Sequence, residues 1–104
     1  MIEIRTYQNK QGSYPFEEWL NGVRDKRAVA RIRTRITRLT MGNEGDWKPV
    51  GEGVRELRIS EGKGYRVYYA WDGMKIVLLL CGGDKRSQVS DIDNAKVYWS
   101  EYNA

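Results

Sequence analysis

The periodicity of apolar residues changes along the chain, and the change predicts where strands and helices lie. Residues 2–7 alternate between apolar and polar side chains, which is the pattern of a half-buried strand. Turn-forming residues follow at positions 9–13. Pro15 suits the first turn of a helix that Asn21-Gly22 ends. The apolar face of this helix consists of Phe16, Trp19, Leu20 and Val23.

A second helix is predicted from Asp25, which can cap its first turn, to about Met41. Its apolar positions recur at intervals of three and four residues, as expected for a side packed against a core. They are Val29, Ile32, Ile36 and Leu39. A second stripe beside them consists of arginines, namely Arg24, Arg27, Arg31, Arg35 and Arg38. Such a stripe is either a solvated face or a surface for an acidic partner or RNA.

The second half of the chain is predicted to consist mainly of β-strands. Residues 42–53 are rich in glycine and polar residues and are predicted to form a loop. Three β-rich runs follow, and Asp72-Gly73 between the last two is a strong hairpin signal. The runs are Val54–Ile59, Tyr65–Trp71 and Lys75–Cys81. Ile76–Leu80 is apolar at every position, as in a central strand covered on both faces.

The C-terminal region predicts one more helix. Ser90 followed by Asp93 resembles a capping box, and apolar residues recur at helical spacing as far as Tyr102. The predicted order is β-α-α-β-β-β-α in one domain of residues 1–104, without repeats or linkers. We therefore predict an α+β fold in which a two-helix hairpin packs on a mainly antiparallel sheet.

Composition narrows the chemistry and the location. The net charge of +4 and the pI near 9.3 favour polyanionic or acidic partners. Without any histidine, catalysis has to come from Arg, Lys, Glu, Asp or Tyr, and we predict no metal and no small-molecule cofactor. The single cysteine, Cys81, lies in an apolar run and is expected to be a buried, unreactive thiol. With no signal peptide and no membrane-spanning segment recognisable, we expect a cytoplasmic protein.

A cationic cluster is predicted on the strands. If a three-residue loop joins the first two runs, Arg58 lies across from Arg66, and Glu56 from Tyr68. Like charges facing each other across a ladder cost stability, so the arrangement favours an anion bound between them. Two further cations, Lys85 and Arg86, follow the central strand and can reach the same surface. The expected ligand is a backbone phosphate.

Simpler structural roles also fit these residues. Arg58 and Arg66 can be ordinary solvent-facing residues of a sheet, and the arginine stripe a solvated face. The tryptophans and Phe16 fit a hydrophobic core better than an RNA-stacking platform. Gly82-Gly83 lacks the spacing of a nucleotide-binding motif and is expected to end a strand.

Five segments resemble the RelE/ParE superfamily of toxins, most closely the HigB-like subgroup known as addiction module killer proteins. The segments are residues 15–20 (PFEEWL), 54–59 (VRELRI), 64–69 (GYRVYY), 79–85 (LLCGGDK) and 91–95 (DIDNA). The resemblance covers nearly the whole chain. It implies two helices packed on a curved antiparallel sheet, which agrees with the predicted order.

The resemblance also implies a function. Members are toxins neutralised by an antitoxin, usually a helix-turn-helix DNA-binding protein, and RelE-like and HigB-like members cleave messenger RNA in the ribosomal decoding site. Arg66 and Arg58 match basic residues of the family's site, and Lys85 or Arg86 matches another. At Glu56, RelE itself has a basic residue. A C-terminal tyrosine also serves in some members, and Tyr98 or Tyr102 can correspond to it.

These matches lead to a hypothesis for the mechanism. RNA carries its own nucleophile, the 2′-hydroxyl, so no histidine or metal is required. Arg58 and Arg66 would clamp the phosphate, Glu56 would act as general base, and Lys85 or a C-terminal tyrosine as general acid. Further RNA contacts are predicted for Arg86, Tyr68, Arg31 and Arg35.

Two other functions compete with RNA cleavage. A ParE-like toxin uses the same fold to inhibit DNA gyrase by binding, and a phage-derived remnant can be a non-toxic module that only pairs with a partner protein. Cleaved messages, blocked supercoiling or the absence of a growth effect would distinguish the three.

Overall fold

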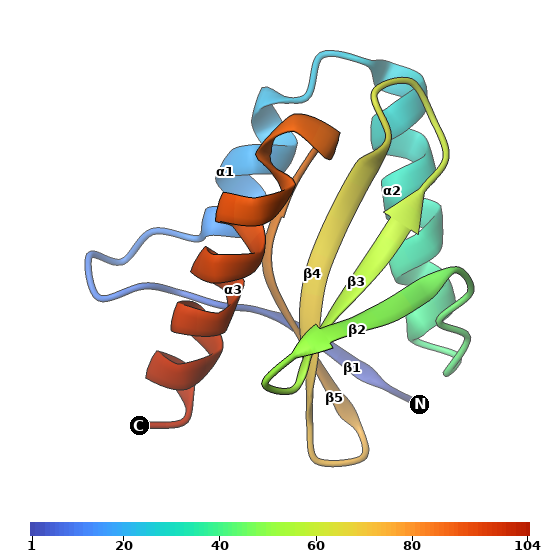
Figure 1. Cartoon of the computed structure of the whole chain (residues 1–104). Coiled ribbons are helices and arrows are strands. Elements are labelled where there is room, and N and C mark those ends of the chain that lie inside the picture. Colours follow the sequence, from blue (N-terminus) through green and yellow to red (C-terminus); the bar gives the residue numbers. More distant parts are fainter.

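A five-stranded sheet lies between helices on its two faces in a computed structural model that describes residues 1–104 (Figure 1). The elements are β1 (Glu3–Thr6), α1 (Pro15–Gly22), α2 (Lys26–Leu39), β2 (Trp47–Gly51), β3 (Val54–Ile59), β4 (Tyr65–Asp72), β5 (Ile76–Gly83), the short 3-10 helix η1 (Lys85–Ser87) and α3 (Gln88–Tyr102). The strand order is β1-β5-β4-β3-β2; β1 runs parallel to β5 and all other neighbours are antiparallel. The predicted α+β class, with two helices on a mainly antiparallel sheet, is confirmed.

One strand was missing from the predicted order. Residues 42–53 are not all loop, because Trp47–Gly51 forms β2 and pairs with β3. Pro49 is tolerated because β2 is an edge strand, where a missing N–H leaves no ladder bond broken. Gly51, Glu52 and Gly53 all have positive φ angles and make the tight turn into β3. The glycines that suggested a loop therefore belong to a β-hairpin.

The predicted start of α2 is confirmed, whereas the predicted start of α3 is wrong. As predicted, the Asp25 side chain caps α2, accepting hydrogen bonds from two backbone N–H groups, and α2 ends at Leu39, two residues before Met41. The predicted capping box at Ser90 is wrong, because α3 already begins at Gln88. A capping box formed by Asp84 and Ser87 starts η1, which leads directly into α3.

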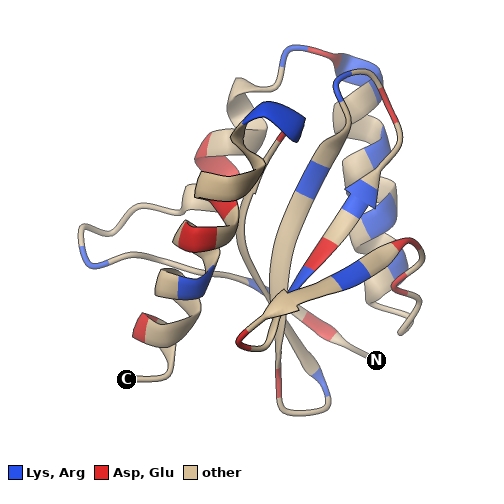
Figure 2. Cartoon of the chain, viewed as in Figure 1, with Lys and Arg blue, Asp and Glu red and all other residues tan.

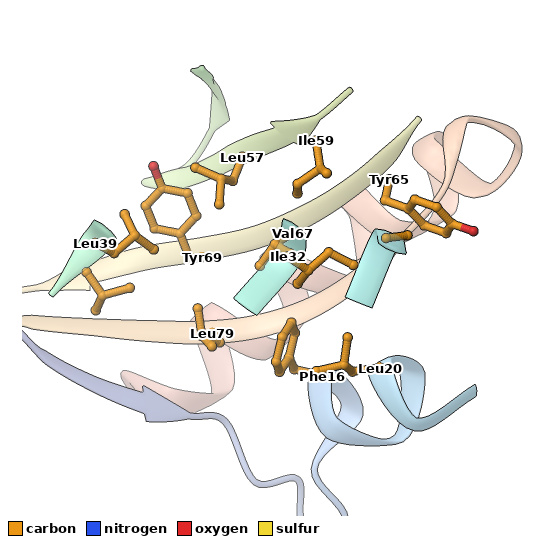
Figure 3. Close-up of a cluster of buried hydrophobic side chains, with 12 residues drawn as sticks. Phe16, Leu20, Ile32, Leu39, Leu57, Ile59, Tyr65, Val67, Tyr69 and Leu79 are labelled. Carbon is orange, nitrogen blue, oxygen red and sulfur yellow. The ribbon is translucent and has the colours of Figure 1, made fainter. Parts of the chain in front are cut away.

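The larger hydrophobic core lies between α1, α2 and one face of the sheet (Figure 3). Alternate residues of β4 point into it, as the period-two pattern predicted. Its buried members include Phe16, Leu20, Ile32, Leu39, Leu57, Ile59, Tyr65, Val67, Tyr69 and Leu79. The apolar stripe of α2 and the inward-facing residues of β3 and β4 therefore form a single cluster.

A second core lies between α3 and the opposite face of the sheet. It combines Tyr68 and Ala70 of β4 with Leu78 and Leu80 of β5 and with Ala95 of α3. Since helices cover both faces, β5 is apolar throughout, as its sequence predicted. Cys81 is buried and free, and burial raises the pKa of its thiol to about 12, as expected for an unreactive side chain.

The two glycines at the end of β5 allow helices to approach on both sides. A Cβ on Gly82 would collide with the ring of Trp19 in α1, and a Cβ on Gly83 would collide with the carboxylate of Asp91 in α3. The pair ends the strand as predicted. In addition, it lets α1 and the start of α3 pack close to the backbone, which determines where η1 and its two cations lie.

Candidate nucleic-acid interface

Two cross-strand rows form the centre of the candidate site. Lys48 of β2 lies opposite Glu56 of β3, and Glu56 lies opposite Tyr68 of β4. In the next row Arg58 lies opposite Arg66. The register predicted from the sequence is confirmed. Residues opposite each other share a face of the sheet, so these side chains emerge together on the face that α3 partly covers.

Lys85 reaches this surface from η1. The Lys85 Cδ atom and the Arg66 Nη1 atom each lie 3.9 Å from the position that a Cβ would occupy on Gly64. Arg66 Nη1 also donates a 3.1 Å hydrogen bond to the Gly64 carbonyl oxygen. Lys85 itself is exposed. The structure therefore brings Lys85 and Arg66 together at the start of β4, beside Arg58.

Glu56 is the buried centre of the polar network below these cations. Its side chain has no exposed surface, and its Oε2 atom accepts hydrogen bonds from Tyr68 Oη at 3.1 Å and Gln88 Nε2 at 2.9 Å. Arg66 Nε lies 3.4 Å from the same oxygen, and Lys48 Nζ lies 3.8 Å from Oε1. A buried carboxylate is stable only when cations and donors surround it, and here both are present.

This burial changes the roles predicted for Glu56 and Tyr68. The general-base role and the direct RNA contact both need an accessible side chain, and neither residue has exposed surface. Burial, followed by the proximity of Glu56, raises the pKa of Tyr68 far above its ordinary value. Both residues instead support Arg66 from below, since Tyr68 donates to Glu56 and Glu56 pairs with Arg66.

The outer cations are paired only weakly. Arg58 Nη2 contacts Asp46 Oδ1 at 3.0 Å, and both side chains are about half exposed. Arg86 is almost fully exposed and lies 4.0 Å from Asp84. Exposed ion pairs of this kind contribute at most about 1 kcal/mol, so a phosphate can replace the carboxylate at little cost.

Arg31 and Arg35, the two α2 arginines predicted to contact RNA, have different surroundings. Arg31 is exposed, with Glu61 at 3.9 Å. Arg35 is half-buried, and its guanidinium donates to the backbone oxygens of Arg58, Glu44 and Asp46 at 2.6, 3.1 and 3.1 Å. Arg35 thus fastens the segment before β2 to the end of β3, a contact that accounts for its burial.

The two C-terminal tyrosines lie away from the cluster of Arg58, Arg66 and Lys85. Tyr102 donates a 2.7 Å hydrogen bond to Asp72, at the end of β4 opposite to Arg66 and about 20 Å along the strand. Tyr98 stacks on Tyr7 with ring centroids 4.9 Å apart, about 15 Å along α3 from Gln88. Of the three candidates for the general acid, only Lys85 lies beside Arg66.

Two residues of the network were missed from the sequence. Lys48 lies in β2, within the segment predicted to be a loop, although Trp47 and Val50 around it are residue types that favour strands. Gln88 contacts Glu56 from α3, which lies 32 residues later in the chain. Sequence spacing cannot predict a contact of this kind, because it depends on how α3 packs on the sheet.

A second carboxylate, Glu44, anchors the segment that carries Asp46 and Lys48. It accepts hydrogen bonds from Arg55 at 2.8 Å, Tyr69 at 2.6 Å and Trp71 at 3.2 Å. Burial alone would raise the pKa of Glu44, but these donors outweigh it and hold the pKa below its ordinary value of 4.5.

Glu44 should make folding sensitive to acid. Because its pKa is lower in the folded state, its stabilising effect is present above pH 4.5 and is lost as the pH falls through the folded value. We expect Glu44→Gln to lower the unfolding free energy by about 2 kcal/mol at pH 7, with the difference shrinking below pH 4.5. Urea unfolding of both proteins between pH 3 and pH 7 measures this. A difference that stays constant down to pH 3 would contradict it.

The charges are unevenly distributed (Figure 2). Lys and Arg gather along α2, on β3 and β4 and at the turn that begins α3, whereas α1 and the body of α3 carry acidic residues. Around the buried Glu56 there are four cations, Lys48, Arg58, Arg66 and Lys85, and the carboxylates in contact with them are Glu56 and Asp46. The surface therefore keeps a positive excess, which suits an anionic ligand.

None of the helices is long and apolar enough to cross a lipid bilayer. No group of three or more His, Cys, Asp or Glu side chains is placed to hold a metal ion. The pockets on the surface are open and shallow; the largest lies between the α1–α2 turn and the β3–β4 turn, with Trp19 and Tyr65 in its wall.

Comparisons with known proteins identify the family of the chain. A protein of Haemophilus influenzae described as uncharacterized is 50% identical over 100 residues, which are 96% of this chain and 95% of the relative. Residues 18–101 match the family described as phage derived protein Gp49-like (DUF891). The match runs from α1 to α3 and so includes the rows of β2, β3 and β4 as well as η1. The chain belongs to the Gp49-like (DUF891) family of phage-derived proteins.

Proposed function

We propose that the protein is the toxin of a type II toxin-antitoxin system and cleaves messenger RNA on the translating ribosome. One observation carries the proposal: Arg66 of β4 and Lys85 of η1 both approach Gly64, and Arg58 lies opposite Arg66 in the sheet. Family membership and the resemblance of five segments to RelE/ParE toxins support it. A surface of several cations on a sheet suits a polymer backbone better than a small metabolite.

The proposed reaction uses the RNA's own 2′-hydroxyl. The 2′-oxygen attacks the adjacent phosphorus and loses its proton to water, the bond from phosphorus to the 5′-oxygen breaks, and the 5′-oxygen gains a proton. The products are a 2′,3′-cyclic phosphate and a 5′-hydroxyl. Arg58 and Arg66 stabilise the charge on the phosphoryl oxygens, and Lys85 donates the proton to the leaving oxygen.

Glu56 is assigned a positioning role in this scheme. The Arg66 side chain is 12% exposed, and its Nε atom lies 3.4 Å from the buried Glu56 carboxylate. Gln88 and Tyr68 hold that carboxylate from two other elements. A guanidinium fixed on one edge presents its remaining N–H groups to the phosphate without losing conformational freedom on binding.

We propose the partners that this function requires. They are a cognate antitoxin, of the helix-turn-helix class by resemblance, and the messenger RNA together with the ribosome, in the cytoplasm. No small-molecule cofactor takes part in the proposed chemistry, because the substrate supplies the nucleophile and the side chains supply charge and a proton.

Induced expression in a bacterial host tests the proposal. We expect growth arrest within minutes and new RNA 5′ ends at codon positions of translated messages, with none in the same messages when the start codon is removed. Mapping 5′ ends by primer extension measures this. Arrest without cleavage but with blocked DNA supercoiling would show a gyrase inhibitor instead, and normal growth would show a non-toxic binding module.

A further inference from the structure

A separate pocket of about 260 Å³ opens where α2 meets the end of β3. Arginines make up half of its lining, and its only apolar residue is Ile59. Its charged and hydroxyl side chains are those of Arg31, Arg35 and Arg38 of α2, together with Asp46, Arg58 and Ser60. Three arginines of α2 thus line one pocket together with an arginine of the sheet.

The positive charge of this pocket is only partly compensated. Arg35 donates its hydrogen bonds to backbone carbonyl oxygens, so no carboxylate neutralises it directly. Burial lowers the pKa of Arg35, Asp46 raises it, and the nearby Arg38 and Arg31 lower it further. Four arginines therefore line the pocket together with one acidic residue, Asp46, and Glu61 lies 3.9 Å from Arg31 outside the lining. An anion would relieve the repulsion between the arginines.

Arg58 connects this pocket to the surface proposed for cleavage. It lies opposite Arg66 in the sheet, yet it also lines the pocket and contacts Asp46 there. Its Nε atom is buried and has no hydrogen-bond partner. A strand bound at Arg66 and Lys85 can therefore continue past Arg58 into the pocket without leaving the positive surface.

We propose that this pocket binds a second backbone phosphate of the same RNA strand that is cleaved at Arg66 and Lys85. The inference rests on the proposed function. Guanidinium groups bind phosphate oxygens bidentately, and a lining with a single apolar residue fits a backbone better than a base or a metabolite. An acidic protein segment is the alternative, but it would not explain why the pocket is continuous with the cleavage surface through Arg58.

Binding of an uncleavable RNA tests this inference apart from cleavage. The probe is a 12-nucleotide 2′-O-methyl RNA, which lacks the attacking hydroxyl, followed by fluorescence anisotropy. We expect the double variant Arg31→Gln/Arg38→Gln to bind it at least about tenfold more weakly than the wild type at low salt. The slope of log affinity against log salt should fall by about 0.7, as for one lost single-strand phosphate contact.

The matched control is Lys26→Gln/Arg33→Gln, which removes the same charge from the same helix outside the pocket. It should bind the probe within about twofold of the wild type. Equal binding of the RNA by the wild type and the pocket variant overturns the inference. It is also overturned if the pocket variant loses binding to a dodecaglutamate peptide but not to the RNA. Failure of the proposed function has a different readout. In that case the wild type cuts no message, whether or not the pocket variant binds the RNA probe.

Discussion

Replacing Arg66 with alanine should reduce message cleavage by at least about 100-fold, as for the loss of one preorganised charge-stabilising donor. Arg66 is the cation on which the proposed site converges, lying beside Lys85 and opposite Arg58. It is also the only arginine of the cluster paired with a fully buried carboxylate, that of Glu56. Growth after induction, together with primer extension on a translated message, measures the effect.

The control for this variant is Arg86→Ala. Arg86 carries the same charge, but it is almost fully exposed and its only ion pair, with Asp84, is 4.0 Å long. We expect Arg86→Ala to reduce cleavage by less than about tenfold. Circular dichroism and thermal unfolding must show that Arg66→Ala is folded at the assay temperature. A folded variant that arrests growth and cuts messages as well as the wild type would refute the proposed site.

Replacing Glu56 with glutamine should have the largest effect on stability. The amide keeps the shape of the side chain but removes the charge that compensates Arg66 and Lys48. Breaking a buried ion pair by removing one partner costs about 3 kcal/mol or more. For a domain of this size, that corresponds to a decrease in Tm of about 12–24 °C. Thermal unfolding followed by circular dichroism measures it.

The matched substitution is Glu52→Gln, in the turn between β2 and β3. The Glu52 side chain is 72% exposed and lies 3.5 Å from Lys96, so its stability change should stay within about 0.5 kcal/mol. If Glu56→Gln is as stable as this control, the network around Glu56 does not hold Arg66 in place. A positioning role also predicts that cleavage by Glu56→Gln falls at temperatures where the variant is still fully folded.

Local patterns were sufficient for most of the secondary structure. The helical spacing of α2 and the alternation in β3 and β4 each depend on residues close in sequence, and the predicted hairpin register placed Arg58 opposite Arg66. β2 was missed because Gly51 and Gly53, which shape the turn, resemble a loop, and because Pro49 is allowed only at an edge. Whether a strand lies at an edge is a property of the sheet and is not visible in the strand itself.

By itself the amino-acid sequence determined the α+β class, the β3–β4 hairpin and the excess of positive charge, because periodicity, turn residues and composition are local properties. Tertiary structure alone decided that Glu56 is buried and that Gln88 and Lys48 join Tyr68 around it. It also excluded Tyr98 and Tyr102, which lie far from Arg66, and left Lys85 as the candidate acid that the sequence had already placed near this surface. The physical reason is that burial and charge pairing depend on which distant elements pack together, and alternation along one strand does not specify what covers its face.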